Sequence, residues 1–524
     1  MTAFSGDAAT GTDLWPATAP EDAGVPSAAI LRVLGRFEQR GLNTHSLLIA
    51  HRGVLAFEGY WAPFTAETPH RLYSASKSYV AVAIGALIDD GALALTDRVV
   101  DHFPDKTPEE VHPYVAAMTV EDLLTMRTAH GGTTYKKVAD PDWVRTFFTV
   151  PPDRVPGMVF SYDTSATVVL TALVERIGGK RLPEFLMDRV LGPIGVQHPV
   201  TALVSPAGTT AEQRAGRPTW REMADNSHGV AHGGSGLFTT PRDFLSFAQL
   251  CLQQGRWAGE QIVSAEYMQA ATGYQTSTAH TGGHLPDSRC GYGYQFWRTR
   301  HNGFSARGMG GQIALCLPDR ELVVVSTGDN QGRTGTEQAF FDAIWDELLP
   351  ALDRDGDSEP AAGTTAAPAA AAAEELDHVR AALALAPVPV QGSSRAGNDF
   401  TGQWLLDQQH PTFTGLALSV AADRGELHLT DRDGQQRTFV FGIGHLMAGT
   451  LPGYGYESLT SGAWLDEQTL YLRVHVLGLY LAQLELTVSV RGDAMTLTMN
   501  KAAEAFAQEY QGTVSRHQAA SSLY

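Results

Sequence analysis

The distribution of apolar residues predicts two β-hairpins that lie far apart in the chain. Ser46–Ala50 and Val54–Phe57 are short apolar runs on either side of a turn at His51–Gly53, which is the pattern of a hairpin. Gln312–Leu317 and Glu321–Ser326 repeat this pattern much later in the sequence. We expect the strands from both regions to form one antiparallel sheet.

Apolar residues spaced three and four positions apart predict helices between and after these hairpins. In Ser76–Asp90, for example, Val80, Ala83, Ile84 and Leu87 recur at this spacing. The other predicted helices are Thr119–Met126, Ala166–Ile177, Pro241–Gln253 and Phe340–Leu352. The larger, N-terminal part of the chain is therefore expected to be α+β, with an antiparallel sheet and a helical region.

Residues 399–524 show a different pattern, in which apolar and polar positions alternate over short runs. The runs are Leu416–Val420, Glu426–Leu429, Thr438–Phe441, Thr469–Val476, Gln483–Val490 and Met495–Met499. This alternation is typical of antiparallel strands and predicts a small all-β domain, most simply a barrel. Because the segment contains no recognisable catalytic set, we interpret it as a structural or lid domain.

A low-complexity stretch separates these two parts. Ser358–Glu375 consists mainly of Ala, Pro and Thr, a composition that is typical of a linker. We therefore expect three regions along the chain: a domain at 1–355, a linker and connecting segment at 356–398, and the β domain at 399–524.

Composition excludes several classes of function for this chain of 524 residues. The net charge of −19 disfavours binding to nucleic acid or to an anionic membrane surface. No apolar run is long enough to span a bilayer, and the first residues lack the pattern of a secretory signal, so we expect a cytoplasmic protein. The three cysteines are far apart, which makes a zinc site or a disulfide framework improbable.

The candidate chemistry begins with Ser74 and Lys77. Ser74 precedes a predicted helix and Lys77 follows three residues later, a spacing that places both side chains on one face. A serine hydroxyl is a weak nucleophile until a neighbour accepts its proton, and a crowded amine can do so. Alone, this spacing is equally consistent with a capping serine and a solvated lysine.

Two further segments could complete such a site. Tyr162 lies just ahead of a predicted helix, where its phenol could enter a cleft and, beside an ammonium group, ionise more easily. Gly308–Gln312 is a glycine-rich entry to a strand, which would allow a substrate close to the backbone. The N–H groups of Ser74 and Gln312 could then form an oxyanion hole. Each segment by itself also fits an ordinary packing role.

Taken together, these segments resemble the serine β-lactamase and penicillin-binding-protein superfamily. The resemblance is to the branch with class C β-lactamases, family VIII-type esterases, D-aminopeptidases and 6-aminohexanoate-dimer hydrolases, and it covers about residues 25–352. Further matching stretches are Leu95–Pro104, Leu123–Gly131, Gly233–Asp243 and Gly291–Trp297. The resemblance implies an antiparallel sheet with helices on both faces beside an all-helical lobe, followed here by a lipocalin-like barrel.

The resemblance also assigns roles to residues. It implies that Ser74 is acylated, that Lys77 accepts the proton, and that Tyr162 shuttles it to and from the leaving group. Thr164 stands where the family usually has Asn. The segment Met309–Gly311 would take the Lys-Thr-Gly-like position, so that Thr164, Met309, Gly310 and Gly311 bind substrate.

The departures at Thr164 and Met309 argue against β-lactamase or cell-wall carboxypeptidase activity, because both activities need a bound carboxylate. A literal His-x-Gly occurs at His301–Gly303, which we interpret as a hairpin turn. His228 and His232 are four residues apart, but the glycines around them disfavour a helical metal site.

The acceptor of the acyl group distinguishes the possible functions. With water, the protein is a carboxylesterase or amidase acting on a small-molecule or short-peptide ester or amide, which is the function we favour. With an amine or alcohol, it is an acyltransferase, a transacylase or a peptide cyclase of a biosynthetic pathway. A non-catalytic binding or sensor protein is the third possibility. None of these requires a metal or cofactor, and the sequence leaves the oligomeric state open.

Overall fold

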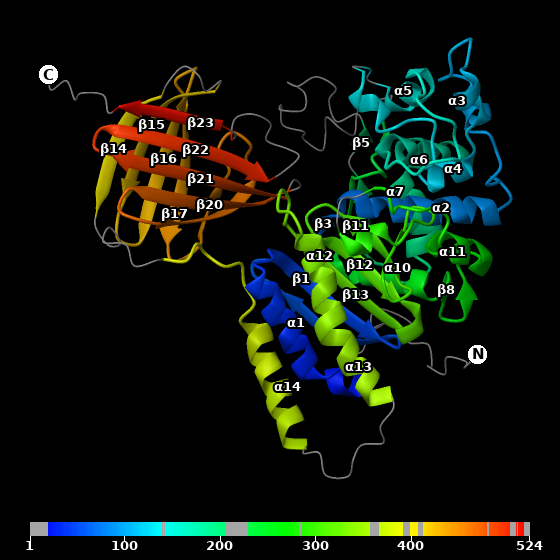
Figure 1. Cartoon of the computed structure of the whole chain (residues 1–524), viewed down its shortest axis with the longest axis horizontal. Coiled ribbons are helices and arrows are strands. Elements are labelled where there is room, and N and C mark those ends of the chain that lie inside the picture. Colours follow the sequence, from blue (N-terminus) through cyan, green and yellow to red (C-terminus); the bar gives the residue numbers. More distant parts are fainter. Residues whose placement is uncertain are drawn as a thin grey trace. The chain divides into compact units, whose positions relative to one another are not determined.

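A computed structural model describes residues 19–138, 140, 142–198, 200–202, 204–205, 229–281, 285–356, 366–390, 399–406, 412–478, 481–502, 510 and 512–517. The chain divides into two compact units (Figure 1). The first unit extends to Ala384, and the second contains Leu385–Tyr524 together with the short stretch Gln331–Arg333.

The two predicted hairpins meet in one sheet of the first unit. Its six strands are antiparallel and follow the order β10-β11-β12-β13-β1-β2. Their bounds are Trp297–Arg298, Phe304–Gly308, Gln312–Leu317, Leu322–Gly328, Thr44–His51 and Val54–Tyr60. The adjacent strands β13 and β1 join the two distant chain regions, with Leu48 opposite Val325. The α+β prediction is therefore confirmed.

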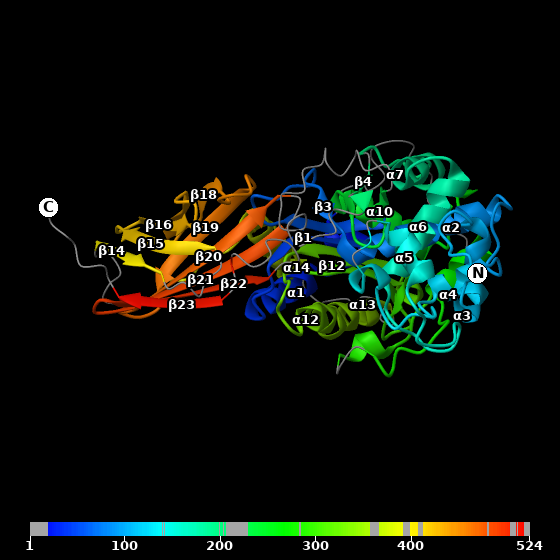
Figure 2. The same ribbon diagram turned by 90° about the horizontal axis from the view of Figure 1, so that it is seen from above.

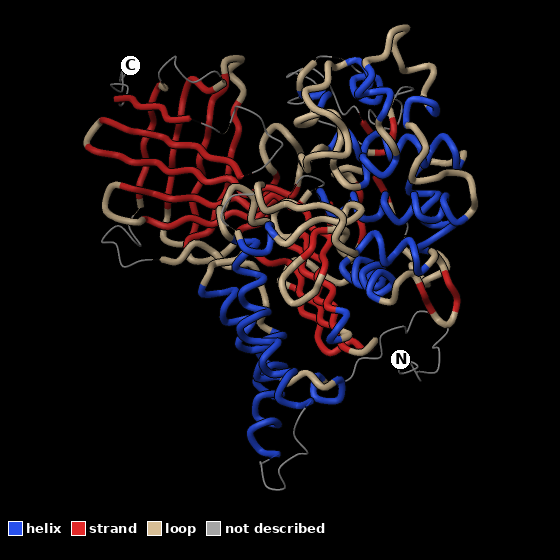
Figure 3. The backbone as a smooth tube through the Cα atoms, turned by 45° about the vertical axis from the view of Figure 1, so that its right-hand side comes forward, coloured by secondary structure: helices blue, strands red, loops and turns tan. Residues whose placement is uncertain are grey.

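Helices cover both faces of this sheet because its strands are apolar on both faces (Figures 2 and 3). Along β1, Leu47 and Ile49 enter the core formed with α1 and α12, whereas Leu48 and Ala50 enter the core formed with α2 and α10. The helices of the first unit are α1 Ser27–Gln39, α2 Ser76–Asp89, α3 Pro113–Ala117, α4 Val120–Leu124, α5 Trp143–Thr149, α6 Thr164–Gly178, α7 Leu182–Leu186, α10 Pro241–Leu252, α11 Ala265–Thr272, α12 Thr336–Ala343, α13 Leu349–Gly356 and α14 Ala366–Ala381.

Seven short strands lie outside the main sheet in the described part of the first unit. β3 (His70–Arg71) and β4 (Thr201–Ala202) both pair with β7 (Leu237–Thr239), β5 (Val204–Ser205) pairs with β6 (Val230–Ala231), and β8 (Arg256–Trp257) pairs with β9 (Glu260–Gln261). β3 and β7 flank the two chain segments that carry the candidate chemistry, because β3 precedes Ser74 and β7 follows the glycines at 233–236.

The linker expected at 356–398 contains a helix instead of a featureless chain. α14 covers the alanine-rich part of it and packs against α1. Alanine has the highest helix propensity of all residues, and the sequence ends this run with Leu376, which is 3% exposed in the core shared with α1. The composition that indicated a linker therefore produces a packed helix.

The second unit is a single sheet of ten strands. Its strands are β14 Phe400–Leu405, β15 Phe413–Val420, β16 Arg424–Asp431, β17 Gln436–Ile443, β18 Met447–Thr450, β19 Glu457–Trp464, β20 Thr469–Leu477, β21 Leu481–Arg491, β22 Ala494–Ala502 and β23 Gly512–His517. Neighbours are antiparallel except β17 and β19, and the first and last strands, β14 and β23, approach each other. The sheet is thus a nearly closed barrel, as the alternating pattern predicted.

The barrel is filled by its own side chains. Alternate residues of its strands are buried, such as Leu416 and Leu418 of β15 or Leu470 and Leu472 of β20. No helix in the described ranges combines the length and the apolar character that a bilayer-spanning segment needs.

A buried histidine in the first unit makes its stability depend on pH. His70 in β3 is 1% exposed, and burial lowers its pKa from 6.5 to about 4. Because the unfolded state binds the proton more readily, the stability that His70 contributes is complete above pH 6.5 and is lost as the pH falls towards 4. The loss approaches roughly 3 kcal/mol below pH 4, of which about 2 kcal/mol is reached at pH 5. Urea unfolding at pH 7.5 and 5.0 should show this loss, and the His70→Asn variant should show a smaller one. An equal pH dependence in both proteins would contradict the assignment.

Candidate active site

Ser74 and Lys77 lie on the same face of a helix entry, as the spacing predicted. Ser74 belongs to the turn η2 (Tyr73–Ala75), which runs directly into α2, and Lys77 is in the first turn of α2. The ammonium Nζ of Lys77 donates to Ser74 Oγ at 3.1 Å. The hydroxyl and its nearest potential proton acceptor are therefore already in contact.

The backbone is strained immediately before Ser74. Tyr73 has a φ of +46°, in the left-handed region that a residue with a side chain rarely adopts. Its ring is 2% exposed, and the Arg71 guanidinium lies 4.3 Å from its centroid, so packing on both sides holds this conformation. Strain of this kind is concentrated at functional sites, where it fixes the direction of a reactive side chain.

Lys77 is enclosed between α2 and the glycine-rich segment that precedes β7. It is 1% exposed, and its Nζ also donates a short hydrogen bond to the carbonyl oxygen of Gly234. Gly234 has no room for a side chain, since an added β-carbon would lie 2.6 Å from Thr164 Cγ2. The absence of a side chain at Gly234 thus lets the backbone carbonyl reach the ammonium group.

Tyr162 brings the third candidate group to the same place. It precedes α6, whose first turn is capped by the carboxylate of Asp163 through the Ser165 N–H at 2.8 Å. The Tyr162 phenol is hydrogen-bonded to the Ser74 side chain, and Lys77 Nζ lies 5.0 Å from the centre of the Tyr162 ring. Alcohol, amine and phenol from remote parts of the chain thus form one cluster.

The ionisation of Tyr162 differs from the expectation. We expected the neighbouring ammonium to ease ionisation of the phenol, but burial instead raises the pKa of Tyr162 well above 10, and the hydrogen bond with Ser74 offsets this only in part. Trp297 stacks on the Tyr162 ring at 5.6 Å, and Tyr292 packs against it edge-on. Tyr162 is therefore a protonated phenol at neutral pH.

The strand that faces Ser74 is β11. An added β-carbon on Gly308 would lie 1.9 Å from the carbonyl oxygen of Leu72, so the backbones of β11 and the residues before Ser74 are in close contact. β10 pairs with β11 at Phe304 and Ser305, and no other strand of the described residues pairs with the remainder of that edge. A strand edge without a pairing strand has backbone N–H groups that could bind a substrate oxygen.

Gln312 lies on the other side of the β11–β12 hairpin. It is opposite Gly308 in the ladder and is fully buried. Its side-chain amide donates to the carbonyl oxygens of Gly328 at 2.6 Å and Met309 at 3.2 Å. These contacts bind the hairpin to β13 and place Gln312 inside the sheet, not on the edge that faces Ser74.

The remaining predicted substrate-binding residues lie in two segments, the start of α6 and the turn between β11 and β12. Thr164 is the first residue of α6, and its N–H donates to Thr133 Oγ1 at 3.2 Å. Met309, Gly310 and Gly311 form the turn between β11 and β12, where both glycines have positive φ and Met309 is 41% exposed. This segment is a hairpin turn and not the middle of a strand.

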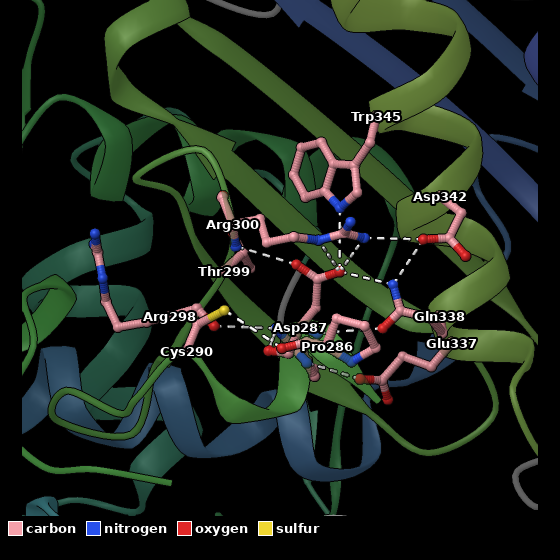
Figure 4. Close-up of polar contacts among 11 residues, drawn as sticks. Pro286, Asp287, Cys290, Arg298, Thr299, Arg300, Glu337, Gln338, Asp342 and Trp345 are labelled. Atoms are coloured by element: carbon pink, nitrogen blue, oxygen red, sulfur yellow. Dashed lines mark hydrogen bonds and ion pairs between the residues drawn. The ribbon is translucent and has the colours of Figure 1, made fainter. Parts of the chain in front are cut away.

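A buried polar network fixes the far side of β11 (Figure 4). The Asp287 carboxylate is 1% exposed and accepts from Arg300 at 2.8 Å, Gln338 at 2.7 Å and Trp345 at 3.1 Å. Burial raises the pKa of Asp287, but these hydrogen bonds outweigh it and hold the pKa below its ordinary value. Arg307 of β11 joins the network by donating to the Asp287 carbonyl oxygen at 3.0 Å.

Other candidates from the sequence take ordinary structural places. His301–Gly303 is the turn between β10 and β11, with the His301 ring 4.7 Å from that of Trp345. His228 lies outside the described residues, and within the described ranges no three His, Cys, Asp or Glu side chains are grouped as a metal site would require.

Sequence reasoning did not identify two parts of the site. The carbonyl of Gly234 contacts Lys77, and the Trp297 ring stacks on Tyr162. The only signal for Gly234 is its place in a run of small residues. Its contact with Lys77 is made by the backbone carbonyl, which every residue has, so the residue type does not predict this role.

The close approach of Gly308 gives a testable consequence. The Gly308→Ala variant should lose catalytic activity by about two orders of magnitude or more, because its methyl group would push β11 away from the Leu72 backbone and widen the site. Gly35→Ala is a matched control, since nothing lies within 4 Å of a β-carbon added there and its φ, like that of Gly308, is not positive. Steady-state kinetics on an activated ester would measure the effect, and full activity of Gly308→Ala would disagree with the structure.

The two-part first unit, with an antiparallel sheet and a helical lobe around a Ser–x–x–Lys and tyrosine cluster, is the architecture of the serine β-lactamase and penicillin-binding-protein class. The family model described as Beta-lactamase matches residues 28–344. The chain belongs to this family.

The chain is similar to two curated proteins and to one solved structure. Protein Rv1367c of Mycobacterium tuberculosis (strain ATCC 25618 / H37Rv) is 26% identical over 277 residues, which cover 47% of this chain and 67% of that protein. The 6-aminohexanoate-dimer hydrolase of Paenarthrobacter ureafaciens is 24% identical over 338 residues, which cover 59% and 79%. The solved structure of a penicillin-binding protein homolog from Caulobacter crescentus superposes with a TM-score of 0.48 at 18% identity, covering 62% of this chain and 99% of that one.

Proposed function

We propose that the protein is a serine hydrolase that cleaves an ester or amide through an acyl-enzyme on Ser74. The observation that carries this proposal is the meeting of Ser74, Lys77 and Tyr162, with Lys77 Nζ 3.1 Å from Ser74 Oγ and the Tyr162 phenol bonded to the same side chain. A hydroxyl held between an amine and a phenol is arranged for nucleophilic attack. The hydrolase name of one curated relative agrees with this class.

Lys77 and Tyr162 would divide the proton transfers. Since burial keeps Tyr162 protonated at neutral pH, Lys77 in its neutral amine form is the group that accepts the Ser74 proton during attack. Tyr162 donates its proton to the departing alcohol or amine, and the proton that Lys77 took from Ser74 then passes to the Tyr162 phenolate, so both groups return to their starting states. In the second half of the cycle the same groups activate water, which releases the acyl group.

The developing oxyanion would lie between backbone N–H groups. The Ser74 N–H at the entry of α2 is one donor, supported by the partial positive charge of the helix start. The open edge of β11 supplies the second. Alternate residues of a strand direct their N–H to the same edge, and Ser305 pairs towards β10. By this alternation the N–H of Met309 points to the same edge as that of Ser305. We therefore assign the Met309 N–H as the second oxyanion donor in place of the N–H of Gln312, which lies in β12.

The site favours an uncharged substrate near the scissile bond. Met309 takes the position of a cationic side chain that would bind a substrate carboxylate. Thr164 takes the position of an amide side chain that would bind a substrate amide. We therefore assign a small-molecule or short-peptide ester or amide that lacks a carboxylate at this position.

Turnover of matched substrates tests the proposal. The wild-type protein should hydrolyse a p-nitrophenyl ester and an anilide of the same short acyl group, and Ser74→Ala should hydrolyse neither above background. Including a primary amine in the reaction and separating the products would show whether water or the amine receives the acyl group. Turnover that persists in Ser74→Ala would overturn the proposed nucleophile, and acyl transfer that exceeds hydrolysis would make the protein an acyltransferase.

A further inference from the structure

His232 lies beside the candidate catalytic cluster and takes no part in the mechanism described above. It follows β6, and its carbonyl oxygen accepts the N–H groups of Ser235 at 3.0 Å and Gly236 at 2.6 Å. These bonds form the tight turn that also directs the Gly234 carbonyl to Lys77. The backbone of His232 is thus fixed to the same segment that holds the catalytic lysine.

The imidazole of His232 is close to this machinery. An added β-carbon on Gly234 would lie 3.6 Å from His232 Cε1 and 2.6 Å from Thr164 Cγ2, so the ring and the threonine both adjoin Gly234. Thr164 stands where the family usually carries an amide side chain. The structure therefore places a second polar group next to the position from which that amide is missing.

One ring nitrogen of His232 lacks a partner. Nδ1 is buried, and no described residue is within hydrogen-bonding distance of it. A buried polar atom without a hydrogen bond costs free energy and is rare in native proteins unless a ligand or water satisfies it. The residue as a whole is only partly buried, so part of His232 remains exposed to solvent.

The charge state of His232 limits what it could bind. Burial lowers the pKa of His232 well below its ordinary value, and the positive charges of Arg71, Lys77 and Lys136 lower it further. The imidazole is therefore neutral at physiological pH and can donate or accept one hydrogen bond at each nitrogen. A neutral ring of this kind suits an amide or a hydroxyl and not a carboxylate.

Aromatic side chains form the wall next to His232. The Trp143 ring meets the imidazole edge-on with 5.6 Å between centroids, and Tyr135 stacks on Trp143 at 3.8 Å. Both rings are partly exposed. This wall offers apolar contact area next to a single hydrogen-bonding group, which is the usual composition of a small-molecule subsite.

We propose that His232 is a specificity-determining residue that hydrogen-bonds an amide or hydroxyl on the acyl portion of the substrate, close to the scissile carbonyl. This inference rests on the proposed function. The leaving group must lie at Tyr162 to receive its proton, so the part of the substrate that reaches His232 is the acyl portion. The preferred substrate would be an N-acylamino or hydroxyacyl ester or amide, with Trp143 against its apolar part.

Two esters with the same leaving group test this inference. p-Nitrophenyl N-acetylglycinate carries an amide near the scissile carbonyl, and p-nitrophenyl pentanoate has a chain of similar length without it. In the wild-type protein kcat/KM should be higher for the glycinate. In His232→Leu the ratio of the two values should fall about tenfold, which corresponds to one lost hydrogen bond. His232→Asn should retain part of the preference, and His102→Leu, a histidine of a distant turn, should leave the ratio unchanged.

Thermal unfolding separates binding from a structural role. If Nδ1 serves the substrate, His232→Leu should unfold at the same temperature as the wild-type protein or higher, because it removes an unsatisfied buried atom. An unchanged ratio, or a lower midpoint with both esters equally impaired, would overturn the inference. If the wild-type protein forms no Ser74 adduct and hydrolyses neither ester, the proposed function itself fails, and the inference with it.

Discussion

Replacing Lys77 by methionine should lower kcat/KM for both ester and amide substrates by about a thousandfold or more. Among the described residues, Lys77 is the group placed to accept the Ser74 proton, since the Tyr162 phenol is protonated at neutral pH. General-base catalysis contributes about two to four orders of magnitude, and loss of the base also removes the activation of the nucleophile. Methionine is similar in length and suits the 1% exposure of this position, so the loss should be catalytic and not structural.

Lys180→Met provides the matched control for this variant. Lys180 is exposed and pairs with Asp188 on the protein surface, so the same chemical change there should leave kinetics unaltered. Circular dichroism and unfolding midpoints of both variants should match those of the wild-type protein. A Lys77→Met protein that keeps a tenth or more of the wild-type kcat/KM would show that another group takes the proton.

Tyr162→Phe should impair amide hydrolysis far more than hydrolysis of an activated ester. An amine leaves only when it is protonated, whereas p-nitrophenolate departs as an anion. Loss of the proton donor therefore lowers mainly the rate of amide hydrolysis. We expect the amide rate to fall by about 10³-fold and the ester rate by tenfold or less. The comparison of the two leaving groups isolates the proton-donor role from any general disturbance of the site.

Tyr292 supplies an internal control for this experiment. Its ring lies 6.3 Å from that of Tyr162, and no contact places its hydroxyl at Ser74 among the described residues. Tyr292→Phe removes the same atom from the same aromatic cluster and should leave the ratio of amide to ester rates unchanged. Equal losses for both substrates in Tyr162→Phe would argue that the phenol orients Ser74 without donating a proton.

Much of the fold follows from local patterns in the sequence. The hairpins at Ser46–Phe57 and Gln312–Ser326 form neighbouring strands of one sheet. Because their strands carry apolar residues on both faces, helices cover the sheet on both sides. α1 was not predicted, although Ile30, Val33, Leu34 and Phe37 have helical spacing and are buried. The alanine-rich sequence of α14 predicts a linker by its low complexity, but alanine also has a high helix propensity, and the segment forms a packed helix.

The candidate site could be predicted in part for a physical reason. Ser74 and Lys77 are neighbours on one helix, so their contact is local and visible as a spacing. The prediction that Tyr162 joins this site depends on the resemblance to the family, because no short-range sequence pattern indicates that α6 packs beside α2. The ionisation of Tyr162, the carbonyl of Gly234 and the buried position of Gln312 result from long-range packing, which the sequence pattern does not specify.

Covalent labelling tests the central claim most directly. The protein would be treated with a fluorophosphonate, digested and sequenced by mass spectrometry, with Ser74→Ala treated in parallel. We predict one adduct of the wild-type protein, located on the side chain of residue 74, and no adduct at any site of the variant. An adduct on another serine, or equal labelling of both proteins, would contradict the account.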